Sequence, residues 1–289
     1  MKLLIFGHEH QEKSMEGIAH LLSTVRHMGI EMAMEDAFKR HVSAGGVTGI
    51  DDVETFHPQE LPQGDVALSL GGDGTFLSTV MWVGDRGLPI LGINTGHLGY
   101  LTSATLEQAD RAVTDLMAGR YTIEQRSMLR VQCQGTQVEH PYALNEIAIL
   151  RQDTSSMIEM DTLLRGNPLT TYKGDGLVVS TPTGSTAYNL SAGGPLLEPT
   201  TRCIVLSPLS PHSLNMRPLV VADDAVLNIV THSRAPYYQV SIDGETVVCP
   251  TGSMVTIDRA PFSTQVVHLE GHDFARTLRH KLLWGTDQR

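Results

Sequence analysis

A buried strand that runs directly into a glycine-rich turn limits the folds open to this chain more than any other feature of its sequence. Val66 to Leu70 is a continuous apolar stretch, Gly71-Gly72-Asp73-Gly74-Thr75 follows it, and Phe76 to Val83 has spacing compatible with a helix. Three glycines let the backbone turn sharply and approach a ligand without interference from Cβ atoms. Their N–H groups and the amino end of the next helix form a cradle suited to a pyrophosphate or triphosphate.

A carboxylate inside an anion-binding turn has more than one interpretation. Asp73 can bind a phosphate that is bridged by Mg²⁺, or accept a proton from an attacking hydroxyl. Alternatively, it caps the following helix, because Asp is a good N-cap residue. The sequence contains neither GxxxxGK[ST] nor GxGxxG, so the turn is neither a P-loop nor the ordinary dinucleotide fingerprint.

Strands alternate with helices over the first 120 residues. The helical segments repeat apolar residues every three or four positions, and Thr105-Leu106-Glu107-Gln108 forms a capping box at the start of the last one, which Gly119 ends. The expected elements are strands at 2–6, 30–34, 66–70 and 88–93, helices at 15–28, 76–83 and 105–118, and a loop at 43–64. This alternation predicts a Rossmann-like parallel sheet that binds ligands at the carboxyl ends of its strands.

The pattern changes after about residue 121, where short β-rich segments recur between turn residues. They lie at 128–133, 143–150, 177–180, 203–206, 226–231, 238–242 and 254–257. Such a series predicts an all-β domain of two packed sheets, a β-sandwich. Apolar residues at four-residue spacing then predict a terminal helix over 274–284. We therefore expect an α/β domain at 1–120, on which residues 270–289 pack back, and an all-β domain at 121–269.

Composition excludes several classes of partner and site. The formal charge is 21 − 32 = −11 without a Lys/Arg cluster, which makes nucleic acid and anionic membranes poor partners. The apolar runs are too short to cross a bilayer, and the opening Met1 to Gly7 is too short for a signal peptide. Cys133, Cys203 and Cys249 form neither a CxxC pair nor a metal-spaced set, so we expect buried free cysteines in a cytoplasmic protein.

Further motifs follow the glycine turn in order along the chain. They are Asn94-Thr-Gly-His-Leu-Gly-Tyr-Leu101, Ala143-Leu-Asn-Glu-Ile147, the run from Gly174 to Pro195, and Pro211-His-Ser-Leu214 with Arg217-Pro-Leu219. The glycine motif alone resembles that of NAD kinases, of diacylglycerol and sphingosine kinases, and of phosphofructokinases. Together, the motifs from about residue 66 to 220 resemble bacterial NAD kinases specifically.

This resemblance implies transfer of the terminal phosphoryl group of ATP to the 2′-hydroxyl on the adenosine side of NAD. It implies Mg²⁺ or another divalent cation with the ATP, Asp73 as the catalytic residue, NAD binding by the all-β domain, and a homodimer or homotetramer. The nucleotide-binding residues that it implies are Gly71, Gly72, Asp73, Gly74, Thr75, Tyr100, Asn145, Glu146, Lys173, Asp175, Thr183, Thr186, Ala187, Tyr188, Asn189, Leu190, Ser191, Ser210, Asp243 and Glu245.

The residue types in these motifs support binding, but each also has a structural interpretation. The adjacent amide and carboxylate of Asn145 and Glu146 can grip ribose hydroxyls or an adenine edge, or form an Asx-type turn. Asp175 lies in what is by default an Asp-Gly turn, and Lys173 can neutralise a phosphate. Asp243-Gly244 is above all a hairpin signal.

The hydroxyl-rich segment Thr181 to Tyr188 has the same two interpretations. It is either the N-cap region of a short helix or a hydrogen-bonding rim for an adenine, on which Tyr188 stacks.

For His97 and His212, capping or turn hydrogen bonds are favoured over a general-base role. The chain carries Ser78 where several members of the family carry a basic residue. If that basic residue helps to hold the phosphate donor, the choice of donor or its affinity stays open here.

Two other functions remain as alternatives. A lipid kinase of the diacylglycerol or sphingosine type shares the glycine motif but lacks the 94–101 and 174–195 motifs. A non-catalytic NAD-sensing module keeps the adenine rim but has no need of Asp73 within its glycines.

Overall fold

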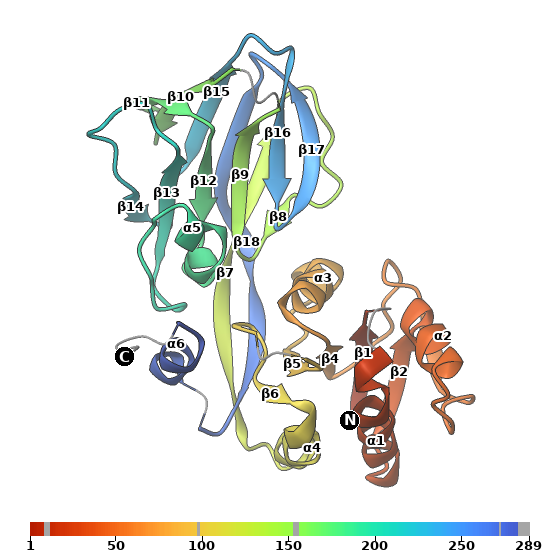
Figure 1. The fold of residues 1–289 in the computed structure, drawn as a ribbon. Helices are drawn as coiled ribbons and strands as arrows, with labels where there is room; N and C mark the ends of the chain where they lie inside the picture. Colours follow the sequence, from red (N-terminus) through yellow and green to blue (C-terminus); the bar gives the residue numbers. More distant parts are fainter. Residues whose placement is uncertain (9–11, 97–98, 153–155, 272, 283–289) are drawn as a thin grey trace. The chain divides into compact units, whose positions relative to one another are not determined.

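The computed structural model describes residues 1–8, 12–96, 99–152, 156–271 and 273–282. Contacts divide the chain into two compact units, one of Met1–Gln125 with Thr264–Arg289 and the other of Arg126–Ser263. The chain runs from the first unit into the second along β7 (Tyr121–Cys133) and returns along β18 (Met254–Leu269), as Figure 1 shows. Among the described residues, no helix has the length and apolar character to cross a membrane.

The first unit, unit 1, is built on a parallel sheet. Its strands are β1 (Lys2–Gly7), β2 (Glu31–Glu35), β3 (Glu54–Phe56), β4 (Val66–Leu70), β5 (Ile90–Asn94) and the short β6 (Ala104–Thr105). They are ordered β3-β2-β1-β4-β5, and Val266 of β18 pairs in parallel with Ile90 beyond β5. The predicted Rossmann-like sheet is confirmed. The strand order reverses between β1 and β4, so the ligand-binding switch point lies at the carboxyl ends of these two strands.

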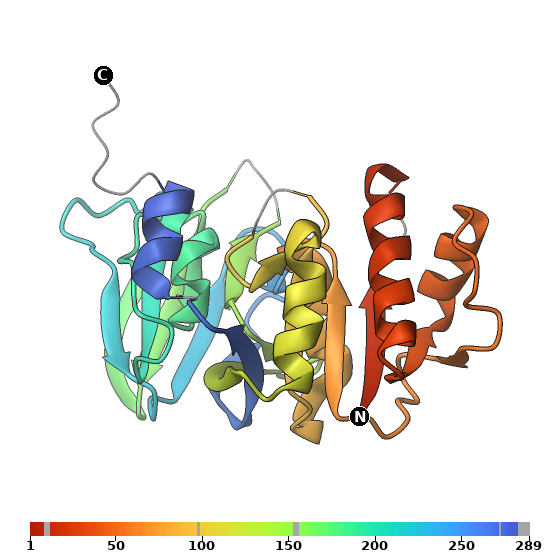
Figure 2. The ribbon, with the colours of Figure 1, turned by 90° about the horizontal axis from the view of Figure 1, so that it is seen from below.

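Helices cover both faces of this sheet. They are α1 (Met15–His27), α2 (Asp36–Ala44), α3 (Asp73–Val83) and α4 (Ala109–Met117), with 3-10 turns at Glu12–Ser14, Gly84–Arg86 and Leu106–Gln108. A further helix of unit 1, α6 (Phe274–Leu282), follows β18. Figures 1 and 2 show α1 and α4 on one face and α3 on the other. The predicted capping box at Thr105 is present. The terminal helix belongs to unit 1, as predicted.

The sequence prediction is wrong over residues 36–56. It places a loop from residue 43 and no helix before it, whereas the structure has α2 and the three-residue β3 there. Only Phe38 and Val42 of α2 are buried, which is too short an apolar repeat to indicate a helix. Both side chains join the core under β1 and β2, so tertiary packing selects the helix.

The second unit, unit 2, is the predicted β-sandwich. One sheet contains β10 (Ile158–Leu164), β11 (Asn167–Gly174) and β15 (Leu227–His232) beside β18, with β7 and β8 (Tyr142–Ala143). The other is ordered β14-β13-β12-β9-β16-β17, from β14 (Leu219–Ala222), β13 (Cys203–Leu209), β12 (Gly176–Ser180), β9 (Glu146–Arg151), β16 (Tyr237–Ile242) and β17 (Glu245–Pro250). One apolar cluster fills the space between them. All three cysteines are free and buried, as expected.

The prediction omits four strands of this sandwich, β10, β11, β14 and β17. Their burial alternates with exposure and several carry charged or polar residues, so they lack the apolar runs that mark the buried strands β9, β12 and β13. The hairpin predicted at Asp243-Gly244 is confirmed. It joins β16 to β17 with φ of 47° and 97° at its two central residues, as a two-residue hairpin turn requires.

The three glycines after β4 are not equivalent. A Cβ atom at Gly71 would lie 2.1 Å from the Thr75 hydroxyl oxygen, whereas a Cβ atom at Gly72 or Gly74 would meet nothing within 4 Å. Gly71 therefore makes the turn from β4 into α3 possible. Gly72 and Gly74 leave their backbone open to the surroundings.

We predict that Gly71→Ala destabilises the protein by about 2 kcal/mol, because the added methyl group must displace the buried Thr75 side chain. Thermal unfolding measures this as a lower Tm. Gly72→Ala is the matched control and should keep nearly the wild-type Tm. Equal stability of the two variants would contradict the packing seen at Gly71.

Candidate active site

The glycine turn lies at the switch point of the unit 1 sheet. Gly71 follows the last residue of β4, and its N–H donates to the carbonyl of Ile93 on β5 at 3.0 Å. Gly72 occupies the N-cap position of α3, and both Gly72 and Gly74 are exposed. Unpaired N–H groups at the start of a helix attract anions. The turn therefore presents an open backbone surface suited to phosphate oxygens.

Asp73 is held in place by the loop that follows β5. Its two carboxylate oxygens accept the backbone N–H groups of Tyr100 at 2.8 Å and Leu101 at 3.0 Å. Because Gly72 is the N-cap residue, the alternative in which Asp73 caps α3 is wrong. Each carboxylate oxygen accepts one of these bonds and keeps a second lone pair. The side chain is thus fixed in orientation while it remains able to accept a proton or contact a cation.

Described residues at both ends of the Asn94–Leu101 segment form a turn after β5 and contact Asp73. Asn94 is buried at the end of β5, where its Oδ1 accepts the Gly96 N–H at 2.7 Å and its Nδ2 donates to Thr102 Oγ1 at 3.4 Å. A Cβ atom at Gly99 would lie 1.8 Å from Asp73 Oδ1, so only glycine allows this approach. Burial and the nearby Asp73 carboxylate raise the pKa of Tyr100. His97 lies outside the described residues.

A second group of candidate residues lies in unit 2, and Asp243 organises it. The Asp243 carboxylate accepts the backbone N–H groups of Leu144 at 2.6 Å, Asn145 at 2.9 Å and Glu146 at 3.0 Å. The N–H of Asp243 also donates to the carbonyl of Glu146 at 3.1 Å. The hairpin turn therefore fixes the position of the Asn145-Glu146 pair. Its Asp-Gly signal in the sequence gave no indication of this role.

Asn145 and Glu146 each carry a polar atom to which no described residue donates a hydrogen bond. Asn145 Oδ1 and Glu146 Oε2 are buried and have no hydrogen-bond partner in the described part of the chain. Burial and the Asp243 carboxylate raise the pKa of Glu146 to about 7, although the Tyr188 backbone N–H donates to its carboxylate. Burial also raises the pKa of Asp243 to about 6, against the effect of its three N–H donors. A buried oxygen without a hydrogen-bond partner is unfavourable, so each of these two oxygens is suited to a ligand that supplies a donor.

The hydroxyl-rich segment forms a 3-10 turn, Thr183–Thr186, and a short helix α5, Tyr188–Ser191, after the carboxyl end of β12. Tyr188 is 38% exposed and its backbone binds Glu146, so this segment adjoins the Asn145-Glu146 pair. Thr183 is buried, and its hydroxyl accepts a bond from the Arg126 guanidinium at 3.3 Å. Ala187, Leu190 and the exposed Ser191 complete the segment.

Asn189 is held entirely by the protein. Its Nδ2 donates to the carbonyls of Ser185 at 3.2 Å and Pro195 at 3.0 Å, and its Oδ1 accepts the Ser207 hydroxyl at 2.7 Å. The side chain is fully buried. Within unit 2 it supports the 183–191 segment.

Lys173, Asp175 and Ser210 are not brought to this group. Asp175 precedes β12 and forms an ion pair with Arg151 at 3.0 Å, and Lys173 pairs with Glu159 at 3.0 Å. Gly176 pairs with Leu150 at this end of the β9–β12 ladder, whereas Ser180 pairs with Glu146 at the other. The N–H of Asp175 donates to the carbonyl of Leu209, next to Ser210, which places all three residues at the far end of β12. Glu245 is exposed beside the Asp243 hairpin.

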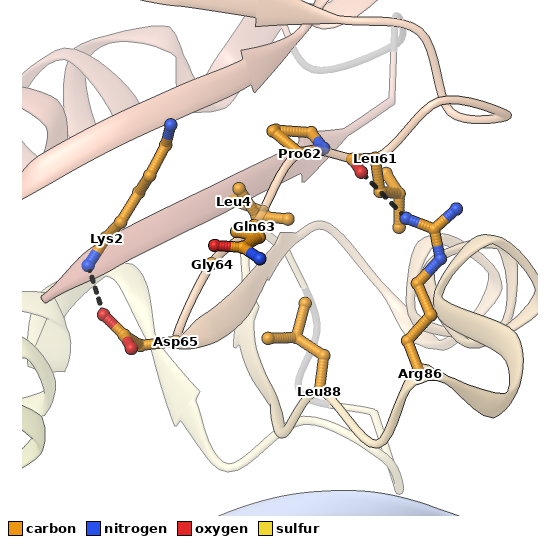
Figure 3. Close-up of a pocket in the computed structure, with 9 residues that line it drawn as sticks. All are labelled: Lys2, Leu4, Leu61, Pro62, Gln63, Gly64, Asp65, Arg86 and Leu88. Atoms are coloured by element: carbon orange, nitrogen blue, oxygen red, sulfur yellow. Dashed lines mark hydrogen bonds between the residues drawn. The ribbon is translucent and has the colours of Figure 1, made fainter.

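A separate cavity of about 550 Å³ in unit 1, drawn in Figure 3, is lined by nine residues at or near the starts of strands of the sheet. It borders the amino ends of β1, β4 and β5, at Lys2, Asp65 and Leu88. Its charged groups are engaged: Lys2 Nζ pairs with Glu54 at 2.5 Å, and the Arg86 guanidinium donates to the carbonyl of Leu61 at 2.9 Å. Ligands of such sheets bind at the carboxyl ends of the strands. This cavity is therefore not the candidate site.

We predict that Glu146→Gln changes the pH dependence of stability. The folded state keeps the Glu146 proton up to about pH 7, whereas an unfolded carboxyl releases it near 4.5. The free energy of unfolding therefore falls as pH rises through this interval, and the neutral amide removes that loss. The Tm of the variant should change less than that of the wild type between pH 5 and 8. At pH 8 we expect the Tm of the variant to be roughly 2–4 °C above that of the wild type. Glu245→Gln is the control, because Glu245 is an exposed carboxylate near the same site. If the Tm of Glu146→Gln changes with pH as that of the wild type does, the raised pKa of the buried Glu146 carboxyl is contradicted.

Comparison with known proteins now adds to this geometry. The family model described as the ATP-NAD kinase N-terminal domain matches residues 3–121, and the one described as the ATP-NAD kinase C-terminal domain matches residues 144–269. An NAD kinase from Bacteroides fragilis is 41% identical over 290 residues, which cover 100% of both chains. An NAD kinase from Porphyromonas gingivalis is 40% identical over 295 residues, with 100% of this chain and 99% of the relative covered.

Solved structures agree with this assignment. A yeast NADH kinase complexed with NADH has the same fold, with a TM-score of 0.90 at 22% identity over 100% of this chain and 89% of the other. An NAD kinase from Archaeoglobus fulgidus in complex with ATP has a TM-score of 0.74 at 26% identity over 98% and 99% of the two chains. Both family models together cover most of the chain, and the relatives match it from end to end. The chain belongs to the NAD kinase family.

Proposed function

We propose that this chain transfers the terminal phosphoryl group of ATP to the 2′-hydroxyl of the adenosine ribose of NAD and so makes NADP. The observation that carries the proposal is the Asp73 carboxylate, which backbone N–H groups hold beside an open glycine turn. The family supports NAD and ATP as the substrates. A lipid kinase or a non-catalytic NAD-sensing module finds no support in these full-length matches.

The donor phosphates bind the glycine turn in this proposal. The exposed backbone of Gly72 and Gly74 and the amino end of α3 offer N–H groups to phosphate oxygens. Mg²⁺ is the expected companion of ATP, because it neutralises charge that develops on the transferred group. Among the described residues, no group of three His, Cys, Asp or Glu side chains could hold a metal ion. One carboxylate, Asp73, suits a cation that arrives with ATP and is held mainly by phosphates and water.

Asp73 acts on the acceptor hydroxyl. A ribose hydroxyl is a weak acid, so its proton leaves late, when the new bond between its oxygen and the terminal phosphorus is already forming. The bond from that phosphorus to the bridging oxygen breaks, and its electron pair stays with ADP. Asp73 orients the hydroxyl and accepts its proton. The Tyr100 and Leu101 N–H groups keep the carboxylate in the required orientation throughout.

Asn145 and Glu146 bind NAD in this proposal. The unpartnered Asn145 Oδ1 and Glu146 Oε2 match the two hydroxyl donors of a ribose better than an adenine edge, which offers donors and acceptors in alternation. The exposed ring of Tyr188 is available for stacking on a base. The other nucleotide contacts proposed for this chain are Gly71, Thr75, Tyr100, Thr183, Thr186, Ala187, Leu190, Ser191, Glu245 and, at the far end of β12, Lys173, Asp175 and Ser210. Asn189 and Asp243 are bonded within the protein and act by positioning the residues around them.

We also propose that the protein is cytoplasmic and works as a homodimer or homotetramer. Three buried free cysteines are suited to a reducing compartment. Exposed apolar side chains on the two edge strands of the six-stranded sheet, Val220 and Val248, and on the neighbouring β16, Tyr237, support association through unit 2.

Asp73→Asn tests the role of Asp73 directly. The amide cannot accept the hydroxyl proton, so we expect turnover to fall by ~10²-fold or more while the Kd for NAD stays within a few-fold. A coupled assay of NADP formation gives kcat, and calorimetry gives the Kd.

Asp85→Asn is the control for this variant, because Asp85 is an exposed carboxylate near the end of α3. Its kinetics should match wild type. Thermal unfolding identifies any loss of the Tyr100 and Leu101 bonds in Asp73→Asn. Near-normal turnover in that variant would remove Asp73 from the chemistry.

A further inference from the structure

A second cavity in unit 1, of about 320 Å³, adjoins the loop that holds Asp73, and most of its lining lies outside the motifs above. One wall is the loop after β5, with Gly99, Thr102 and Ser103. Gly99 is in contact with the Asp73 carboxylate, so the cavity begins where the catalytic side chain is anchored. Its volume falls at the lower end of the roughly 300–1,000 Å³ typical of small-molecule sites.

Helices α4 and α6 form the other walls. The α4 side contributes residues 108, 111, 112 and 115, and the α6 side contributes residues 273, 276, 277 and 281. Both sets have the spacing of a single helical face, so each helix turns one side to the cavity. Arg279 lies between these positions on α6 and does not line the cavity.

Most charged groups on these walls are already engaged. Asp115 binds Arg120 at 2.7 Å and Arg111 at 3.4 Å. Asp273 Oδ1 accepts the backbone N–H of Arg276 at 2.7 Å and so caps α6. Glu270 is exposed to solvent. Among the described residues, none of these acidic side chains forms an ion pair with Arg276 or Lys281.

Lys281 is the exception among the wall cations. Its side chain has no ion-pair or hydrogen-bond partner in the described part of the chain, and it is partly buried. Burial lowers the pKa of its ammonium group, and the Asp73 carboxylate raises it. Lys281 lines the same cavity as Gly99, which contacts the Asp73 carboxylate, so the ammonium faces the region where Asp73 is anchored.

The glycine turn lacks a cation of its own. Between Gly71 and Leu101 the sequence has one Lys or Arg residue, Arg86, and it lines the cavity of Figure 3 at the amino ends of the strands. Ser78, on the first turns of α3, donates its hydroxyl to the carbonyl of Gly74 at 3.2 Å and carries no charge. Phosphoryl transfer requires positive charge near the phosphates.

We propose that Lys281 of α6 binds the terminal phosphates of the donor beside Asp73, with Arg276 at the same cavity as a second phosphate contact. The ligand of this subsite is a chain of condensed phosphates, from ATP or from inorganic polyphosphate. This subsite rests on the proposed NAD kinase activity and adds a phosphate-binding role for the C-terminal helix. The ammonium group contacts the phosphoryl oxygens through its three donors, and no proton transfer is assigned to it.

Lys281→Gln tests the proposal in the full-length enzyme. We expect kcat/KM for ATP to fall roughly 10- to 100-fold, while the Kd for NAD measured by calorimetry changes less than about two-fold. Lys281→Arg, which keeps the charge, should retain kcat/KM within about three-fold. Arg279→Gln, on the same helix but away from the cavity, should behave as wild type, and thermal unfolding confirms that all variants fold.

Two ligands separate the possible sources of the phosphates. Inhibition by inorganic tripolyphosphate should weaken in Lys281→Gln by a factor similar to the loss for ATP, because both present the same phosphate chain. Unchanged inhibition by tripolyphosphate, or unchanged kcat/KM for ATP, would overturn the subsite. If the wild-type enzyme makes no NADP from ATP and NAD, the proposed function is overturned instead. Calorimetry of tripolyphosphate binding to wild type and to Lys281→Gln would still test the role of Lys281 in that case.

Discussion

The contact on which the unit 1 site depends is the pair of hydrogen bonds from the Tyr100 and Leu101 N–H groups to the Asp73 carboxylate. It connects the turn after β4 to the loop after β5, two segments that meet at the switch point of the sheet. The contact is possible only because residue 99 is glycine. A mobile Asp at a helix start would lose conformational freedom on binding each substrate, whereas a fixed one is already oriented.

In unit 2 an Asp carboxylate also accepts backbone N–H groups, but there the bonds position other site residues. Asp243 receives three backbone N–H groups, and these bonds hold Asn145 and Glu146 rather than a substrate. This arrangement is electrostatically unfavourable, because it buries the Asp243 and Glu146 carboxyl groups near each other. The pKa values of both groups are raised as a result. Glu146 can therefore exist in either protonation state near neutral pH, which matters for a group that binds hydroxyls as donor or acceptor.

The sequence predicted the elements with strong local signals. Continuous apolar runs indicated β4, β5, β9, β12 and β13, and the capping box marked the start of the turn before α4. Elements with weak patterns escaped prediction, among them α2, with two buried apolar residues, and the alternating edge strands β14 and β17. Their structure depends on packing partners that are distant in sequence.

The same distinction applies to the site. Residues that share one motif, Gly71 to Thr75 or Asn145 and Glu146, are close because they are neighbours in the chain, so the sequence by itself determined the glycine turn, the adjacent amide and carboxylate, and the family. Only the tertiary structure decided that residues 100 and 101 bind Asp73 and that Asp243 holds the Asn145-Glu146 pair. It also decided that Lys173 and Asp175 lie at the far end of β12, and that Lys281 lines the same cavity as Gly99. The reason is physical: sequence spacing defines a local conformation, whereas contacts between residues tens or hundreds of positions apart are set by strand order and by helix packing.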